Sequence, residues 1–209
     1  MKASDRVRWI WSSKDTAELR ARYDKWASDY DADLDEAFGW IGPEKAAEVL
    51  ADLVPTEAKV LDAGAGTGLV GLALASHGYK NLIAADISEG MLNRARKKKV
   101  YREFYRVVLG EPLAFKTDSF DAVISVGVLT EGHAPPSALV ELVRLTKPGG
   151  CIVFTLRTDL YETGGFKEIQ EGLVHRNRWT LVATSDPFRP LPKGEPGVFH
   201  HVWAYRVAG

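Results

Sequence analysis

The chain has 209 residues, a formal net charge of −1 and 45% hydrophobic residues. This length and composition suit one domain with a sizeable core, and we expect residues 1–209 to form it. The near-zero charge argues against a nucleic-acid partner and against binding to an anionic membrane surface. No apolar run approaches the length of a membrane span. We therefore expect a small-molecule partner, and a protein that is either a monomer or a homodimer.

Cysteine usage and the first residues bear on the cellular compartment. Cys151 is the only cysteine, so no internal disulfide can form. Charges are scattered over residues 1–8 and no apolar stretch follows them, which is not the pattern of a secretory signal. We expect a cytoplasmic protein.

Residues 1–55 show helical patterns only. Asp15 and Glu18 have the spacing of a capping box, which satisfies free backbone N–H groups at the start of a helix. The next positions give this helix one apolar and aromatic face, made of Leu19, Tyr23, Trp26 and Tyr30. A second helix is expected from Gly42 to the residues before Pro55, because Pro43 suits a first helical turn.

From residue 56 the pattern changes to strands alternating with helices, which predicts βαβ units and a parallel sheet. Strands are expected at 59–63, 81–86, 104–109, 122–126 and 151–156, with helices at 68–77, 89–98 and 136–145. The tail predicts a helix at 165–173 and then two successive strands at 179–184 and 199–207, which can pair antiparallel. We therefore expect an α/β fold with a mostly parallel seven-stranded sheet, an antiparallel C-terminal hairpin and helices on both faces.

A glycine-rich loop follows the first predicted strand. Glycines at 64, 66 and 68 allow the backbone to turn sharply and to approach a ligand that a Cβ would keep away. The dinucleotide-binding pattern places its third glycine at position 69, which is Leu69 here. Asp62 adds a carboxylate that suits an ammonium group and would repel a pyrophosphate. The loop therefore favours S-adenosylmethionine (SAM) over a dinucleotide.

Asp86 ends the second predicted strand, near the spacing of about 20 residues at which an acid receives ribose hydroxyls in such folds. A carboxylate can accept both the 2′ and 3′ hydroxyls, which selects an unphosphorylated ribose such as that of SAM or NAD. The alternative for Asp62 and Asp86 is that they are strand-end acids that cap a helix or face solvent.

Over residues 59–155 the chain resembles the class I SAM-dependent methyltransferases. The resemblance is carried by VLDAGAGTG at 60–68, DISEGM at 86–91, SFDAVIS from 119 and ELVRLTKPGG ending at 150. A closer likeness, from residue 23 to about residue 157, is to the Williams-Beuren syndrome region methyltransferase-like proteins, through YDKWASDYDADL, LGEPLAF and VGVLTEGHAPPSALVELVRLTKPGG. It implies a Rossmann-like core at 56–209 with an N-terminal helical lid segment at 1–55.

The resemblance also implies which residues hold the cofactor. The predicted contacts are Asp62, Gly64, Ala65, Gly66 and Gly68 in the loop, Asp86 on the ribose, Ile87 and Met91 against adenine, Leu109, Gly110 and Glu111 at the adenine edge, and Val126 and Gly127 on the floor. Many class I members have an acid where Leu109 stands, so this contact would pass to backbone groups or to Glu111.

Methyl transfer from a sulfonium depends mainly on alignment of the reacting atoms, so it does not require a dedicated base. If the acceptor must lose a proton, the candidates are Glu131 and His133, which follow the fourth predicted strand at the carboxyl edge of the sheet. The alternative is that His133 only caps the next helix or lies exposed.

The aromatic face of Tyr23, Trp26 and Tyr30 has two interpretations. Such a face is more often core, but the N-terminal helices of the family commonly cover the site. We expect Tyr23 or Tyr30 to touch cofactor or substrate, since aromatic faces suit a sulfonium cation, and we expect Trp26 to pack inside.

The prediction is a SAM-dependent methyltransferase that acts on a small molecule and releases S-adenosylhomocysteine. A non-catalytic SAM-binding module and an NAD-dependent oxidoreductase are the alternatives, and Leu69 counts against the second. The basic residues at 94–99 are interpreted as a solvated helix end rather than a nucleic-acid patch. No His, Cys or Asp cluster has metal-ligand spacing.

Overall fold

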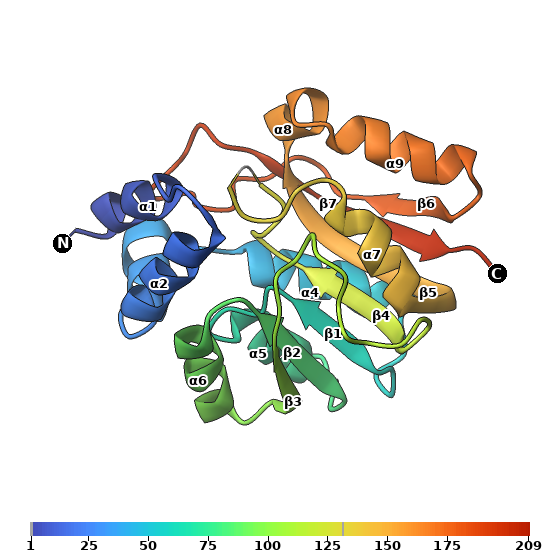
Figure 1. Ribbon diagram of the computed structural model, residues 1–209, viewed down its shortest axis with the longest axis horizontal. Coiled ribbons are helices and arrows are strands. Elements are labelled where there is room, and N and C mark those ends of the chain that lie inside the picture. Colours follow the sequence, from blue (N-terminus) through green and yellow to red (C-terminus); the bar gives the residue numbers. More distant parts are fainter. Residues whose placement is uncertain (1, 131) are drawn as a thin grey trace.

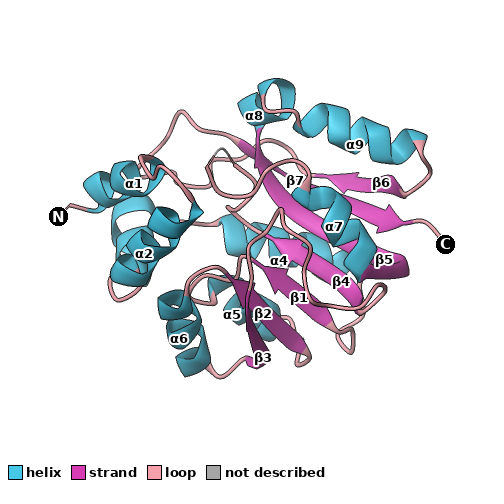
Figure 2. Ribbon diagram, in the orientation of Figure 1, coloured by secondary structure: helices cyan, strands magenta, loops and turns pink. Residues whose placement is uncertain are grey.

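The computed structural model describes residues 2–130 and 132–209. Its described part contains a seven-stranded sheet with the strand order β3-β2-β1-β4-β5-β7-β6 (Figures 1 and 2). The strands are β1 (Val60–Ala63), β2 (Leu82–Asp86), β3 (Tyr101–Arg106), β4 (Phe120–Ser125), β5 (Thr146–Arg157), β6 (Trp179–Thr184) and β7 (His200–Val207). The first five strands are parallel, whereas β7 pairs antiparallel with both β5 and β6. The fold class predicted from the sequence is confirmed.

Helices cover both faces of this sheet because successive strand residues point to opposite sides. Val60 and Leu82 pack on one side, and Leu61 and Ile83 pack on the other. The first side is covered by α4 (Gly42–Leu53), α5 (Leu69–Ser76) and α6 (Glu89–Lys98), and the second by α7 (Ala138–Leu145), α8 (Thr158–Thr163) and α9 (Phe166–His175). Both sides of the sheet are therefore buried, which explains the near-continuous apolar composition of the central strands.

The third strand differs from its prediction. It was expected at 104–109, and it spans Tyr101–Arg106. In this edge strand only Tyr101 is buried and Phe104 is half-buried, whereas the other four residues are exposed, so its hydrophobic signal is weak. The predicted strand included the apolar run Val107 to Leu109. This run follows the end of β3, and its residues line a cavity.

The N-terminal residues form a separate layer at one end of the sheet (Figure 1). It consists of α1 (Ala3–Trp11), α2 (Thr16–Trp26), α3 (Tyr30–Ala32) and a π-helix, η1 (Asp33–Phe38). Ile10, Leu19 and Trp26 pack together in a small core of their own. The helix α1 was not predicted, because Ile10 is its only buried residue and gives it no clear apolar face.

The predicted capping box at the start of α2 is present in a modified form. Asp15 Oδ1 accepts a hydrogen bond from the Glu18 N–H at 2.8 Å, whereas Glu18 Oε2 accepts from the Lys14 N–H at 2.8 Å. The helix ends at Trp26, earlier than the aromatic spacing suggested, and the chain turns before α3. Among the described residues, no helix combines the length and the apolar character that crossing a lipid bilayer demands.

Candidate cofactor-binding and active site

The glycine loop joins β1 to α5, and its glycines serve different purposes. Gly64, Gly66 and Gly68 all have positive φ, at 90°, 53° and 93°. A Cβ on Gly64 would lie 2.2 Å from Cγ2 of Val128, so this glycine allows the loop after β4 to approach closely. A Cβ on Gly66 would meet nothing within 4 Å, so this residue borders open space. Gly66 therefore leaves free space beside the loop.

Asp86, at the end of β2, is held by the same loop. Its Oδ2 accepts from the Gly66 N–H at 2.8 Å, and its Oδ1 accepts from the Ser88 N–H at 2.9 Å. Burial raises the pKa of Asp86 from 3.8 to about 6, although these two backbone bonds act in the opposite direction. Each carboxylate oxygen retains capacity for a further hydrogen bond.

Asp62 lies behind the loop and does not line the cavity described below. Its side chain is fully buried and accepts a hydrogen bond from the hydroxyl of Tyr101 on β3. Burial raises the pKa of Asp62 to about 7. Its second oxygen, Oδ1, has no hydrogen-bond partner among the described residues. The Tyr101 hydroxyl also accepts from the Gly71 N–H at 2.9 Å, so it ties β1, β3 and α5 together.

A cavity, which we call the first cavity, lies at the carboxyl ends of β1, β2 and β4, beneath α2 and α3. Its lining combines apolar side chains with a few polar groups, as small-molecule sites do. The predicted residues that line it are Tyr23, Tyr30, Gly64, Ala65, Gly66, Asp86, Ile87, Met91, Leu109, Val126, Gly127 and His133. This is the edge of an open α/β sheet at which ligands bind.

Four predicted contact residues do not line the first cavity: Asp62, Gly68, Gly110 and Glu111. Cβ atoms on Gly68 and Gly110 would lie 2.9 Å from Tyr101 and 2.8 Å from Pro135, so these glycines serve packing. The candidate base Glu131 lies outside the described residues.

Other residues of the first cavity were missed by sequence reasoning. They are Leu19, Trp40, Thr67, Leu69, Val70, Val107, Val108, Val128 and Ala134. Thr67 and Leu69 could have been predicted to line the cavity, because they are adjacent in sequence to the glycines of the loop. Nothing in the local sequence distinguishes Trp40 from an ordinary core residue.

The aromatic residues of α2 and α3 differ in their surroundings. Trp26 is 5% exposed, and its Nε1–H donates to Asp33 Oδ2 at 2.7 Å. Tyr23 and Tyr30 line the first cavity, and burial raises the pKa of both phenols. The Tyr23 hydroxyl lies 2.7 Å from Nε2 of His133. Because the phenol keeps its proton, we assign it as the donor and Nε2 as the acceptor.

Two aspartates fasten these N-terminal helices to the cofactor side. Asp24 accepts from the Ser88 hydroxyl at 2.6 Å and from the Gly90 N–H at 2.8 Å, at the start of α6. Asp31 accepts from the hydroxyl of Thr67 in the glycine loop and from Nζ of Lys98 at 2.6 Å. These contacts fasten the N-terminal helices over one side of the first cavity, and Lys98 of the basic cluster takes part in them.

The residues of the first cavity fit an adenosyl sulfonium. Gly66 presents bare backbone to open space, and Asp86 retains acceptor capacity for ribose hydroxyls. Apolar side chains from Ile87, Met91 and Val108 offer a surface for adenine. The face of Tyr30 suits a positively charged sulfur.

Comparison with known proteins agrees with this geometry. Residues 61–154 match the family model described as "Methyltransferase domain". Methyltransferase-like protein 27 of Homo sapiens is 38% identical over 175 residues, which is 82% of this chain and 70% of that protein. Further relatives are matched over 20% to 50% of their length.

Solved structures share the fold. A SAM-dependent methyltransferase of Thermotoga maritima has a TM-score of 0.63 at 20% identity, covering 90% of this chain and 98% of that one. A SAM-dependent methyltransferase of Mesorhizobium loti has a TM-score of 0.58 at 18% identity, covering 79% and 100%.

The chain belongs to the class I SAM-dependent methyltransferases. SAM is therefore the cofactor, and the dinucleotide-dependent oxidoreductase is no longer a candidate.

Proposed function

We propose that this chain methylates a small molecule, with Asp86 on the cofactor ribose and with Tyr23 and His133 at the reacting end. One observation carries the proposal. The glycine loop, the Asp86 carboxylate and the Tyr23–His133 pair all line the first cavity. These groups come from elements far apart in sequence, and each suits a different part of the reaction.

The cofactor contacts follow from this arrangement. Gly64, Ala65 and Gly66 would border the methionine part and the ribose, and Ile87 and Met91 would border adenine. Leu109 would lie near the adenine edge, while Val126 and Gly127 would form the floor. The remaining predicted contact residues would not touch the cofactor and would instead hold the loops in place. They are Asp62, Gly68, Gly110 and Glu111.

When bound, SAM supplies an electrophilic methyl group: a lone pair of the acceptor bonds to that carbon, the carbon–sulfur bond breaks, and its electrons leave with neutral S-adenosylhomocysteine. The residues of this chain align the acceptor and exclude water, which supplies much of the rate enhancement. A hydroxyl or thiol acceptor must also lose a proton. Tyr23 would receive it while passing its own proton to Nε2 of His133, 2.7 Å away.

A small acceptor is supported by the enclosure of the site. The contacts of Asp24 and Asp31 hold the N-terminal helices over the proposed cofactor edge, which suits a small acceptor better than a polymer. The net charge of −1 adds no general attraction for nucleic acid. The stretches that resemble the Williams-Beuren syndrome region proteins include the lid and the segment after β4, so we also propose that the chain belongs to that subgroup. We propose a single domain, acting as a monomer or homodimer.

The test is incubation with SAM carrying an isotopically labelled methyl group and a metabolite extract, followed by mass spectrometry. We expect one or a few labelled small molecules, together with S-adenosylhomocysteine. His133→Gln should bind SAM normally and lower turnover of a hydroxyl acceptor by about 10²-fold to 10³-fold. Normal SAM binding with no labelled product from any extract would instead indicate a non-catalytic binding module.

A further inference from the structure

A second cavity adjoins the first on the side away from the glycine loop. The two cavities share the wall residues Tyr23, Tyr30, Trp40, Gly127 and His133. An acceptor must lie in line with the methyl group and the sulfur, so it has to occupy space next to the cofactor. The shared wall contains the Tyr23–His133 pair, which places this pair between the two spaces.

Many of the apolar walls of the second cavity come from the N-terminal helices and from the loop before β7. Ile10, Trp26 and Leu34 belong to α1, α2 and η1, and each is at most 6% exposed. Leu191 and Val198 belong to the loop that leads into β7. Such walls stabilise an apolar ligand by removing its surface from water, and they offer little compensation for desolvating a charged one.

The acidic run of the lid does not face this cavity. Asp33 accepts from Arg6 and from Trp26, and Asp31 pairs with Lys98. Neither aspartate lines the second cavity, although their neighbour Leu34 does. These carboxylates therefore hold the lid together, and they do not form a site for a cationic acceptor.

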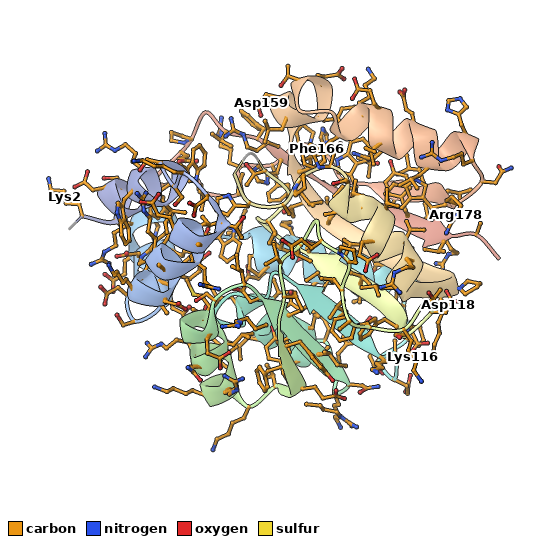
Figure 3. All side chains as sticks on the ribbon, viewed as in Figure 1. Lys2, Lys116, Asp118, Asp159, Phe166 and Arg178 are labelled. Atoms are coloured by element: carbon orange, nitrogen blue, oxygen red, sulfur yellow. The ribbon has the colours of Figure 1, made fainter. Side chains whose placement is uncertain are left out.

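The charged residues among the described lining of the cavity are one cation, Arg157, and one anion, Glu195. Arg157 forms two bonds with Asp159, at 2.6 Å and 3.0 Å, and its guanidinium lies 5.7 Å from the ring centre of Trp11. Asp159 is labelled at the start of α8 in Figure 3. Glu195 is the other charged residue among the described lining, and it has the opposite sign.

His200 is a polar but neutral part of the wall. Burial lowers its pKa to about 4, so the ring is uncharged at neutral pH. Its Nδ1 has no hydrogen-bond partner among the described residues. The ring therefore adds no charge to the wall of the second cavity.

We propose that the second cavity is the acceptor site and that it selects a neutral, largely apolar molecule carrying one hydroxyl or thiol, directed toward Tyr23 and His133. This rests on the proposed function and adds the substrate class. Aromatic acceptors suit the site best, because Trp26 and Trp40 offer rings for them to pack against.

The test uses 2-naphthol as a neutral aromatic probe and 2-naphthoate and 2-(aminomethyl)naphthalene as its charged counterparts. Binding to the full chain is measured by calorimetry with S-adenosylhomocysteine present. We expect 2-naphthol to bind at least tenfold more tightly than either charged analogue. Equal or tighter binding of a charged analogue would overturn the proposed substrate class.

Val198→Trp tests the location, because Val198 lines the second cavity but not the first. This change should fill the second cavity and weaken 2-naphthol binding at least tenfold, while S-adenosylhomocysteine affinity stays within twofold. Val140→Trp, on the exposed face of α7, is the matched control and should change neither. Unchanged 2-naphthol affinity in Val198→Trp would overturn the site.

A wrong acceptor site and a wrong proposed function would give different binding results. If S-adenosylhomocysteine binds and 2-naphthol does not, the acceptor-site proposal is wrong and the proposed function stands. If neither SAM nor S-adenosylhomocysteine binds, the proposed function fails first. Labelled products that are all charged would also overturn the proposed acceptor class while leaving methyl transfer intact.

Discussion

Replacing Asp86 with asparagine separates cofactor binding from folding. The ionised carboxylate is unfavourable in the ligand-free protein, because its pKa rises from 3.8 to about 6. This shift corresponds to about 3 kcal/mol at neutral pH. Asparagine removes that cost but also weakens the bonds from the Gly66 and Ser88 N–H groups, each worth about 1 kcal/mol or somewhat more. We expect the melting temperature of the ligand-free variant to be unchanged or higher.

The same change should weaken SAM binding. The carboxylate can accept both ribose hydroxyls, and asparagine offers a single acceptor oxygen without a charge. Loss of one charge-assisted hydrogen bond costs about 1.5–3 kcal/mol, which corresponds to a 10-fold to 100-fold rise in Kd. The assay is calorimetric titration with SAM, paired with thermal melting of the ligand-free protein. A Kd within twofold of the parent protein would remove Asp86 from the ribose.

Three further predictions concern the same region. SAM affinity should be constant above pH 6 and fall as the pH drops below about 6, because binding then requires Asp86 to lose a proton. Asp86→Asn should flatten that profile in calorimetry, and an unchanged profile would assign the proton elsewhere. Gly64→Ala should destabilise the fold by about 2–4 kcal/mol in denaturant titrations, since its Cβ would clash. Gly66→Ala should cost only about 1 kcal/mol of stability and weaken SAM binding at least tenfold, and the reverse order would contradict their assigned roles. Tyr101→Phe should lower the melting temperature by about 2–10 °C, because one hydroxyl serves a buried carboxylate and a backbone N–H. The exposed Tyr105→Phe is its control, and equal shifts in both variants would refute the role of Tyr101.

The ligand-free stability should also depend on pH. A carboxyl group whose pKa is raised by folding stabilises the protein at low pH, and this contribution is lost as the pH rises through its folded pKa. For Asp86 the loss falls between pH 3.8 and about 6, and for Asp62 it extends to about 7. This dependence has the sign opposite to that of the SAM affinity, so the two measurements test the same groups independently.

Much of the fold and the cofactor loop was predictable because their signals are local. The bend after β1 requires residues without a Cβ, so the glycine spacing and the following acid, Asp86, appear directly in the sequence. Buried parallel strands are continuous apolar runs between glycine and proline turns, which placed β1 and β2 within one residue of the structure. The bounds predicted for the edge strand β3 were wrong, because only part of this strand is buried and its apolar pattern is weak.

The sequence by itself thus determined the class of fold, the cofactor loop and the acid that follows it, since each depends on neighbouring residues. Only the tertiary structure decided that Tyr101 holds Asp62, that Tyr23 meets His133, and that Trp40 stands between two cavities. These contacts join residues from separate elements, and the spacing within one segment carries no information about which distant segment will pack against it. The proposed acceptor site is lined by residues from the N-terminal helices, the edge of the sheet and the loop before β7. Its lining could therefore not be predicted from any single segment of the sequence.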